Sequence, residues 1–195
     1  MVRKVLLGVL LVAGFVFAAW FCLLENPLLE ENTASLIGVR YPVQFVVFST
    51  LNGASFCLGA LAMYRKYNFR SRLGTICALT APVMLLVTLL TQGDLVDGEI
   101  TFSGTTKVIH WTATILFILG VVASLALLFF MLRKRVRGFT ALCAITLSIV
   151  IGMIVTILTI GKSGLFEAVP IWLMYILLFL VNCTNLFPLR KLEDA

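Results

Sequence analysis

The sequence predicts an all-α fold: a polytopic membrane protein built as a six-transmembrane-helix bundle, with the N and C termini cytoplasmic. Three observations predict it, namely the composition, a series of long uncharged runs and the placement of the basic residues. Of the 195 residues, 61% are hydrophobic and 12% are charged, whereas soluble domains carry about 45–50% and about 25%. A soluble fold of this size would lack the polar side chains needed to cover its surface. Disorder is excluded as well, because it requires low hydrophobicity.

Each predicted span is a run of roughly 20 residues without Asp, Glu, Lys or Arg, the length that crosses the hydrocarbon core of a bilayer. The six runs are residues 5–24, 41–63, 73–91, 108–132, 139–160 and 169–188. The connections on the cytoplasmic side are short, so consecutive helices are expected to be antiparallel neighbours within one domain, residues 1–195. The longer connections, 25–40 and 92–107, are expected to lie outside and to fold partly over the mouth of the bundle.

The placement of Lys and Arg orients the bundle, because cytoplasmic loops of membrane proteins carry the basic excess. Twelve of the fifteen basic residues fall on one side: Arg3, Lys4, Arg65, Lys66, Arg70, Arg72, Arg133, Lys134, Arg135, Arg137, Arg190 and Lys191. The other side carries seven of the nine carboxylates. The net charge of +6 is thus explained by topology. We expect membrane lipids as partners and no nucleic acid. We expect a multi-pass protein of the cell membrane.

The N-terminal run leaves one alternative open. Arg3 and Lys4 precede an apolar stretch that ends near Ala18 and Ala19, which is also the layout of a cleavable signal peptide. The run of about 20 residues is long for the apolar part of such a peptide. We therefore expect a retained first span.

Several kinds of site are not expected from the residues present. The five cysteines all fall inside predicted spans without a CxxC pair, so we interpret them as packing residues. With a single histidine, the usual zinc and haem sites are excluded, and we expect neither a metal nor a cofactor. The sequence has no Walker loop, no GxGxxG and no GxSxG.

Two stripes of polar and small residues predict faces that meet other helices. The second span carries residues spaced by three or four: Gln44, Phe48, Asn52, Ser55 and Gly59. That stripe should point inward, either for interhelical hydrogen bonding and close packing or to line a ligand cavity. In the fifth span, Ser148, Gly152 and Thr156 are expected to form a packing ridge.

His110 is the single histidine and lies near the outer end of the fourth span, beside Trp111. An imidazole there could act as an acid or base, with Glu167 and the acidic outer loop within reach. It could equally anchor the helix at headgroup depth together with Trp111. The candidate catalytic residue is His110, and the candidate ligand-binding residues are Gln44, Asn52, Ser55, His110 and Glu167.

Three segments resemble a known family. They are SLIGVRYPVQFVVFSTLNGASFCLGAL (35–61), KVIHWTATILFILG (107–120) and GLFEAVPIW (164–172). In order and content they resemble the six-span Frag1/DRAM/Sfk1-like membrane protein superfamily, especially its bacterial branch of unknown function. The residues that the resemblance carries over are Ser35, Gly38, His110 and Glu167. It implies a shared outward-side site and lipid or amphiphile handling.

The expected function is therefore that of an integral plasma-membrane protein whose outward-facing polar pocket binds a lipid or small amphiphile without catalysis. One alternative is a membrane enzyme that acts on lipid headgroups with His110 as acid/base. The other is an accessory or substrate-binding subunit of a larger membrane complex or transporter, with a membrane protein as partner.

Overall fold

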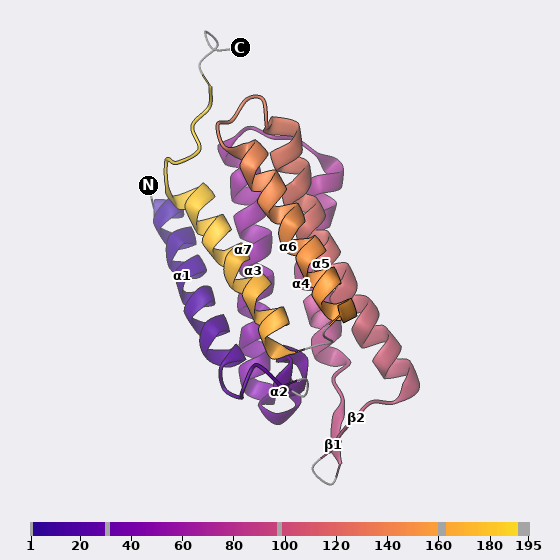
Figure 1. The fold of residues 1–195 in the computed structure, drawn as a ribbon. Coiled ribbons are helices and arrows are strands. Elements are labelled where there is room, and N and C mark those ends of the chain that lie inside the picture. The colour runs from indigo at the N-terminus through magenta and orange to yellow at the C-terminus, as the bar shows by residue number, and fades with distance from the viewer. Residues whose placement is uncertain (1, 30–31, 97–98, 160–162, 191–195) are drawn as a thin grey trace.

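The computed structural model (Figure 1) describes residues 2–29, 32–96, 99–159 and 163–190, and for residues 156–158 it describes the backbone only. The helices are α1 (Val2–Cys22), α2 (Ala34–Arg40), α3 (Pro42–Lys66), α4 (Arg72–Leu90), α5 (Gly104–Leu132), α6 (Phe139–Thr159) and α7 (Gly164–Cys183). Two short strands, β1 (Asp94–Val96) and β2 (Glu99–Thr101), pair antiparallel. The predicted all-α class is confirmed, with this hairpin as a small addition.

Five of the described helices are long and apolar enough to cross a membrane, namely α1, α3, α4, α5 and α7. In α6, the apolar stretch whose side chains the structure describes is Phe139–Val155, which is shorter than in those five helices. Large hydrophobic side chains are exposed along the helices, for example Val9 on α1 and Ile115 on α5. Such a surface suits contact with lipid tails, because the helices satisfy their own backbone polar groups. Helices able to span a membrane are thus confirmed, and the number six stays a prediction.

The helices pack around α3, which contacts α1, α4 and α7, while α5 packs on α4 and α6 packs on α5 (Figure 1). The described chain begins and ends at the same end of the bundle. That end also holds the basic connections 65–72 and 133–137, and we call it the basic end. The opposite end carries α2 and the β-hairpin, and we call it the hairpin end.

Three predictions of element bounds change, and the first concerns α5, which begins at Gly104, four residues before the uncharged run 108–132. The last helix runs from Gly164 to Cys183, five residues earlier than the uncharged run 169–188. Its first turn contains Glu167, because a carboxylate is favourable at the positive end of a helix and so does not mark a boundary there. The 25–40 connection contains α2, a helix that no apolar run of membrane-spanning length could indicate.

The predicted packing ridge of α6 is wrong for the two residues that the structure describes. Ser148 and Gly152 are exposed, and a Cβ built on Gly152 would meet no atom within 4 Å. The face of α6 that packs inward carries Phe139, Leu142 and Thr146 instead, all of them buried. Apolar bulk therefore decides which face of this helix turns inward. The third ridge residue, Thr156, has a side chain outside the described part.

The segment after α7 is tied to the other connections of the basic end. Arg137 N–H donates to the Pro188 carbonyl at 3.1 Å, and Arg190 N–H donates to the Arg135 carbonyl at 2.8 Å. The Tyr67 hydroxyl donates to the Phe187 carbonyl at 3.0 Å. Burial raises the pKa of Tyr67 to about 12, so this donor stays protonated at neutral pH. These bonds hold the 65–72 and 133–137 connections against residues 187–190.

Two buried tyrosines provide a matched test of hydrogen bonding between helices. Tyr64 of α3 lies 2.8 Å from both the carbonyl and the hydroxyl oxygen of Ser124 in α5. The Tyr175 hydroxyl forms no hydrogen bond to any described residue, although Ser55 lies nearby. Tyr64→Phe is therefore expected to lower the free energy of unfolding by about 0.5–1.5 kcal/mol, and Tyr175→Phe to leave it unchanged or raise it. Thermal unfolding of both variants in the same detergent checks this, and equal losses would contradict it.

Candidate functional site: a cavity near the hairpin end

A cavity of about 130 Å³ lies in the half of the bundle nearer the hairpin end. Every described helix except α1 contributes to its wall. The lining residues are Ala34, Ser35, Phe45, Phe48, Phe56, Leu85, Thr88, Thr114, Phe117, Ile118, Val121, Val122, Thr146, Ile149, Val150, Met153, Glu167, Pro170, Ile171 and Met174. Apolar cavities of about this size can accept a small apolar molecule.

The body of the cavity is apolar even where its lining residues are not. Phe56 of α3 and Phe117 of α5 stack on each other in its wall, with ring centroids 6.0 Å apart. Three threonines reach the wall, but each hydroxyl donates to the carbonyl four residues earlier in its own helix. Those hydroxyls are consequently satisfied within the helices, and the wall they form presents mainly methyl groups.

One end of the cavity is polar and is built where α7 begins beside α2. Glu167 is the single ionisable side chain among the described lining residues. Its Oε2 accepts a hydrogen bond from the Ala34 N–H at 2.8 Å. Ala34 is the first residue of α2, and its N-cap residue, Thr33, makes no side-chain capping bond. The carboxylate thus takes the place of a cap, which satisfies one of the free N–H groups of the helix and meets its positive end. Ser35 lines the cavity next to it.

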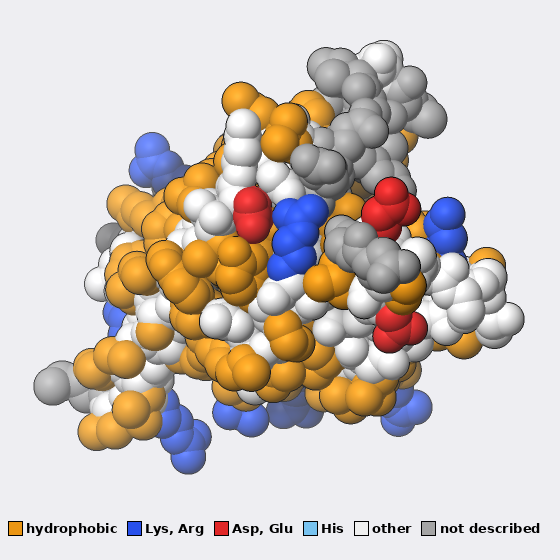
Figure 2. All heavy atoms as spheres, turned by 90° about the horizontal axis from the view of Figure 1, so that it is seen from below, with side chains coloured by type: hydrophobic (Ala, Val, Ile, Leu, Met, Phe, Trp, Pro, Cys, Tyr) orange, Lys and Arg blue, Asp and Glu red, His pale blue; other side chains and the backbone are white. Residues whose placement is uncertain are grey.

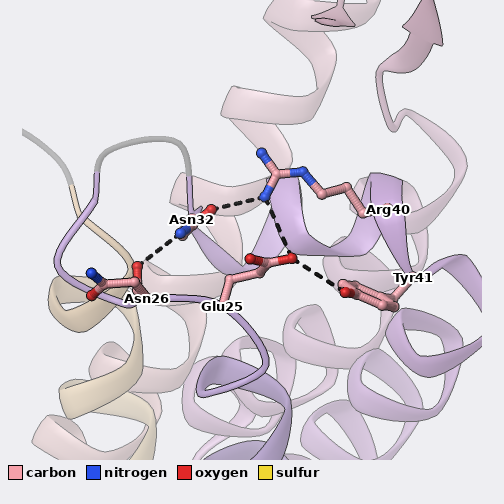
Figure 3. Close-up of polar contacts among 5 residues, drawn as sticks. All are labelled: Glu25, Asn26, Asn32, Arg40 and Tyr41. Atoms are coloured by element: carbon pink, nitrogen blue, oxygen red, sulfur yellow. Dashed lines mark hydrogen bonds and ion pairs between the residues drawn. The ribbon is translucent and has the colours of Figure 1, made fainter. Parts of the chain in front are cut away.

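The α1–α2 connection that supports this polar end is held by a network of side chains (Figure 3). Arg40 donates from Nη1 to Asn32 Oδ1 at 2.9 Å, and the same nitrogen lies 3.8 Å from Glu25 Oε1. Tyr41 donates to Glu25 Oε1 at 3.2 Å, and Asn32 donates from Nδ2 to the Asn26 carbonyl at 2.8 Å. Arg40 and Glu25 are each about one-third exposed, so water screens their attraction. The network therefore acts mainly by positioning Asn32.

The same connection lies directly against the start of α7. Leu165 N–H donates to the Pro27 carbonyl at 2.7 Å. A Cβ built on Gly164 would overlap the Asn32 carbonyl oxygen. Glycine is therefore required at this position by a close approach of two backbones, and the approach brings Glu167 within reach of α2.

The polar stripe of α3 points inward, as predicted, but it does not form the cavity wall. Phe48, Asn52, Ser55 and Gly59 are buried and Gln44 is half-buried, while only Phe48 of these lines the cavity. Asn52 donates to the Phe48 carbonyl at 2.8 Å. Its Oδ1 and the Ser55 hydroxyl have no hydrogen-bond partner among the described residues. These groups lie in the packed interior, so the packing interpretation describes their placement better than the cavity interpretation.

His110 is not among the residues that line the cavity. The imidazole is 3% exposed, packs on Phe102 with ring centroids 5.5 Å apart, and faces the backbone of Thr88 in α4 and of Thr91 directly after it. Its Nδ1 has no hydrogen-bond partner within the described residues, and no described carboxylate pairs with it. The neighbouring Trp111 is 36% exposed.

The residues carried over from the family resemblance fall into two places. Ser35 and Glu167 meet at the polar end of the cavity. Gly38 packs against Phe45 and Gln92, each of which would lie 2.5 Å from a Cβ at this position. Gly38 and His110 thus both border the C-terminal end of α4. Sequence reasoning missed the apolar lining of α6 and α7, such as Met153 and Met174, because these residues look like any other residues of an apolar helix.

The hairpin end, seen end-on in Figure 2, shows hydrophobic side chains over much of its area with a few acidic and basic side chains between them. No three His, Cys, Asp or Glu side chains in the described ranges gather as a metal site would require.

Comparisons of the chain with protein-family models, with curated proteins and with solved structures find no match.

Proposed function

We propose that the chain is a multi-pass protein of the cell membrane that binds a lipid or small amphiphile, without catalysis, in the cavity near its hairpin end. In this proposal α6 is the sixth span, both termini are cytoplasmic and the hairpin end faces outward. The orientation is supported by the basic residues that gather at the opposite end. The observation that carries the binding function is the cavity itself, an apolar chamber with Glu167 and Ser35 at one end.

The shape and chemistry of the cavity favour a particular kind of ligand. Aromatic and aliphatic walls suit a hydrocarbon chain, because burying apolar surface is favourable by about 25 cal/mol per Å². A carboxylate at the end suits a headgroup that donates hydrogen bonds, above all a cationic one. The ligand class we propose is thus an amphiphile with an amine or hydroxyl headgroup.

Binding is favoured over catalysis by the surroundings of His110. A general acid or base needs a partner within hydrogen-bond reach and access to substrate. His110 is buried outside the cavity lining, and no described carboxylate pairs with it. The enzyme alternative therefore gains no support from this geometry.

Filling the cavity is expected to abolish binding. Ile118 lines the cavity, whereas the next residue of α5, Leu119, is 54% exposed and does not line it. Ile118→Trp should place an indole in the chamber, while Leu119→Trp should place it in the surrounding lipid or detergent. We expect native mass spectrometry with octylamine as probe to show the adduct for the wild type and Leu119→Trp, and at least about tenfold less for Ile118→Trp.

Both tryptophan variants need thermal unfolding curves close to that of the wild type for the comparison to count. A milder substitution, Ile118→Phe, serves if the larger ring disrupts the bundle. Equal octylamine adducts in all folded variants would contradict the proposal, because binding would then be independent of the cavity.

A further inference from the structure

A second hollow lies at the basic end, on the far side of the bundle from the cavity. It is a groove between the end of α3 and the start of α4, lined among others by Arg65, Arg70 and Arg72 and by Leu61, Phe69 and Ile76. All three arginines are exposed. The lining contains no Asp or Glu.

The loop that joins α3 to α4 and carries Arg70 is held in place by contacts with the bundle. Phe69 N–H donates to the Tyr64 carbonyl at 2.8 Å, and the Phe69 ring meets the Tyr64 ring edge-on at 5.1 Å. Tyr64 is buried and bonded to Ser124 of α5. Asn68 adopts a left-handed backbone, with φ of 49°, which reverses the chain between the two helices. The guanidinium groups are therefore attached to an ordered backbone.

The arginine side chains of the groove are available to an external anion. Within the described residues, Arg65, Arg70 and Arg72 form neither ion pairs nor side-chain hydrogen bonds. In the 133–137 connection, Arg133 donates to the Phe130 carbonyl at 2.5 Å and its guanidinium lies 3.7 Å from the centre of the Phe130 ring, whereas the side chains of Arg135 and Arg137 make no hydrogen bond or ion pair among the described residues. The groove is thus distinguished by combining three arginines, all without a partner among the described residues, with an apolar wall.

The start of α4 adds to the positive potential of the groove. Arg72 is the first residue of this 19-residue helix, and the Ser71 side chain caps only the Gly74 N–H, at 3.0 Å. The N–H groups of Arg72 and Leu73 remain at the positive end of the helix, where an anion is stabilised.

The apolar wall indicates what kind of anion fits. Ile76 is 62% exposed and Leu73, one turn before it, is 60% exposed. Both lie on the flank of a helix long and apolar enough to span a membrane. Basic groups at the level of the headgroups, continuous with an apolar flank, match the two parts of a phospholipid.

We propose that this groove binds one anionic phospholipid, with its phosphate between Arg65, Arg70 and Arg72 and an acyl chain along Leu61 and Ile76. Arginine is suited to the task because its planar guanidinium contacts phosphate oxygens in pairs. The site is independent of the amphiphile cavity, so either proposal can fail without the other.

The test compares two triple variants that remove the same charge from the same end of the protein. R65Q/R70Q/R72Q alters the groove, and R133Q/R135Q/R137Q alters the other connection. The full chain is purified in detergent, and native mass spectrometry measures adducts with added phosphatidylglycerol or phosphatidylcholine. We expect the wild type to prefer phosphatidylglycerol, the groove variant to lose that adduct by at least about tenfold, and the control to change by less than about twofold.

Three results would overturn the proposal: equal losses in the two triple variants, equal binding of the two lipids, or displacement of the lipid by millimolar inorganic phosphate. The last would identify a site for a soluble anion. Should the groove variant unfold, Arg70→Gln alone replaces it, because Arg70 lies in the loop outside both helices. A several-fold loss is expected for that variant, and no loss would overturn the proposal.

Discussion

Replacing Gly164 with alanine is expected to destabilise the protein by about 3 kcal/mol or more, because the new Cβ would overlap the Asn32 carbonyl oxygen. Relief requires movement of backbone, since the opposing atom belongs to the main chain and not to a flexible side chain. The start of α7 would move away from the α1–α2 connection and strain the Leu165 to Pro27 hydrogen bond. Thermal unfolding in detergent measures the loss.

Gly104 provides a matched control for this substitution. Like Gly164, it is the first residue of a long helix and follows a serine at the N-cap position. A Cβ on Gly104 would meet no atom within 4 Å. Gly104→Ala is therefore expected to be neutral or to stabilise by up to about 1 kcal/mol, through the lower entropy of the unfolded chain. Equal effects at the two glycines would contradict the close approach as the cause.

The long helices could be predicted well because one strong effect indicates them. An ionised side chain is costly in lipid, so the uncharged runs give helices to within a few residues for α1, α3, α4 and α6. The prediction is poorest where a charged residue belongs to a helix. Glu167 interrupts the apolar run, yet it lies in the first turn of α7, where a carboxylate is favourable, and α2 supplies its hydrogen-bond donor. A partner 133 residues away leaves no local signal.

The cavity could be predicted only in part. Glu167 and Ser35 stand out in the sequence as polar residues beside the spans, and they do line it. Asn52 and Ser55 have the same appearance but lie in the packed interior, because their helix is central and contacts neighbours on several sides. Polarity within a span indicates the inward face. It does not tell which part of that face is left open, since this depends on the volumes of side chains from other helices.

Glu167→Gln is expected to separate the structural role of this side chain from its proposed role in binding. The glutamine carbonyl oxygen can still accept the Ala34 N–H, so the free energy of unfolding should fall by less than about 1 kcal/mol. Glu167→Ala removes the acceptor and should cost about 1.5–3 kcal/mol. For octylamine the loss of the negative charge should reduce the adduct about tenfold in Glu167→Gln, whereas octanol, which carries no charge, should bind almost as well as to the wild type.

A matched charge loss elsewhere at the hairpin end shows whether this effect belongs to the cavity. Glu25 lies in the Arg40 and Tyr41 network and does not line the cavity. Because an exposed charge is screened beyond about 10 Å at 0.1 M salt, Glu25→Gln should leave octylamine binding within about twofold of the wild type. If the two variants weaken octylamine binding equally, the Glu167 carboxylate acts only through the overall electrostatic potential of the hairpin end. If Glu167→Gln weakens the binding of octylamine and of octanol alike, the substitution alters the shape of the cavity, and the proposed headgroup contact is wrong.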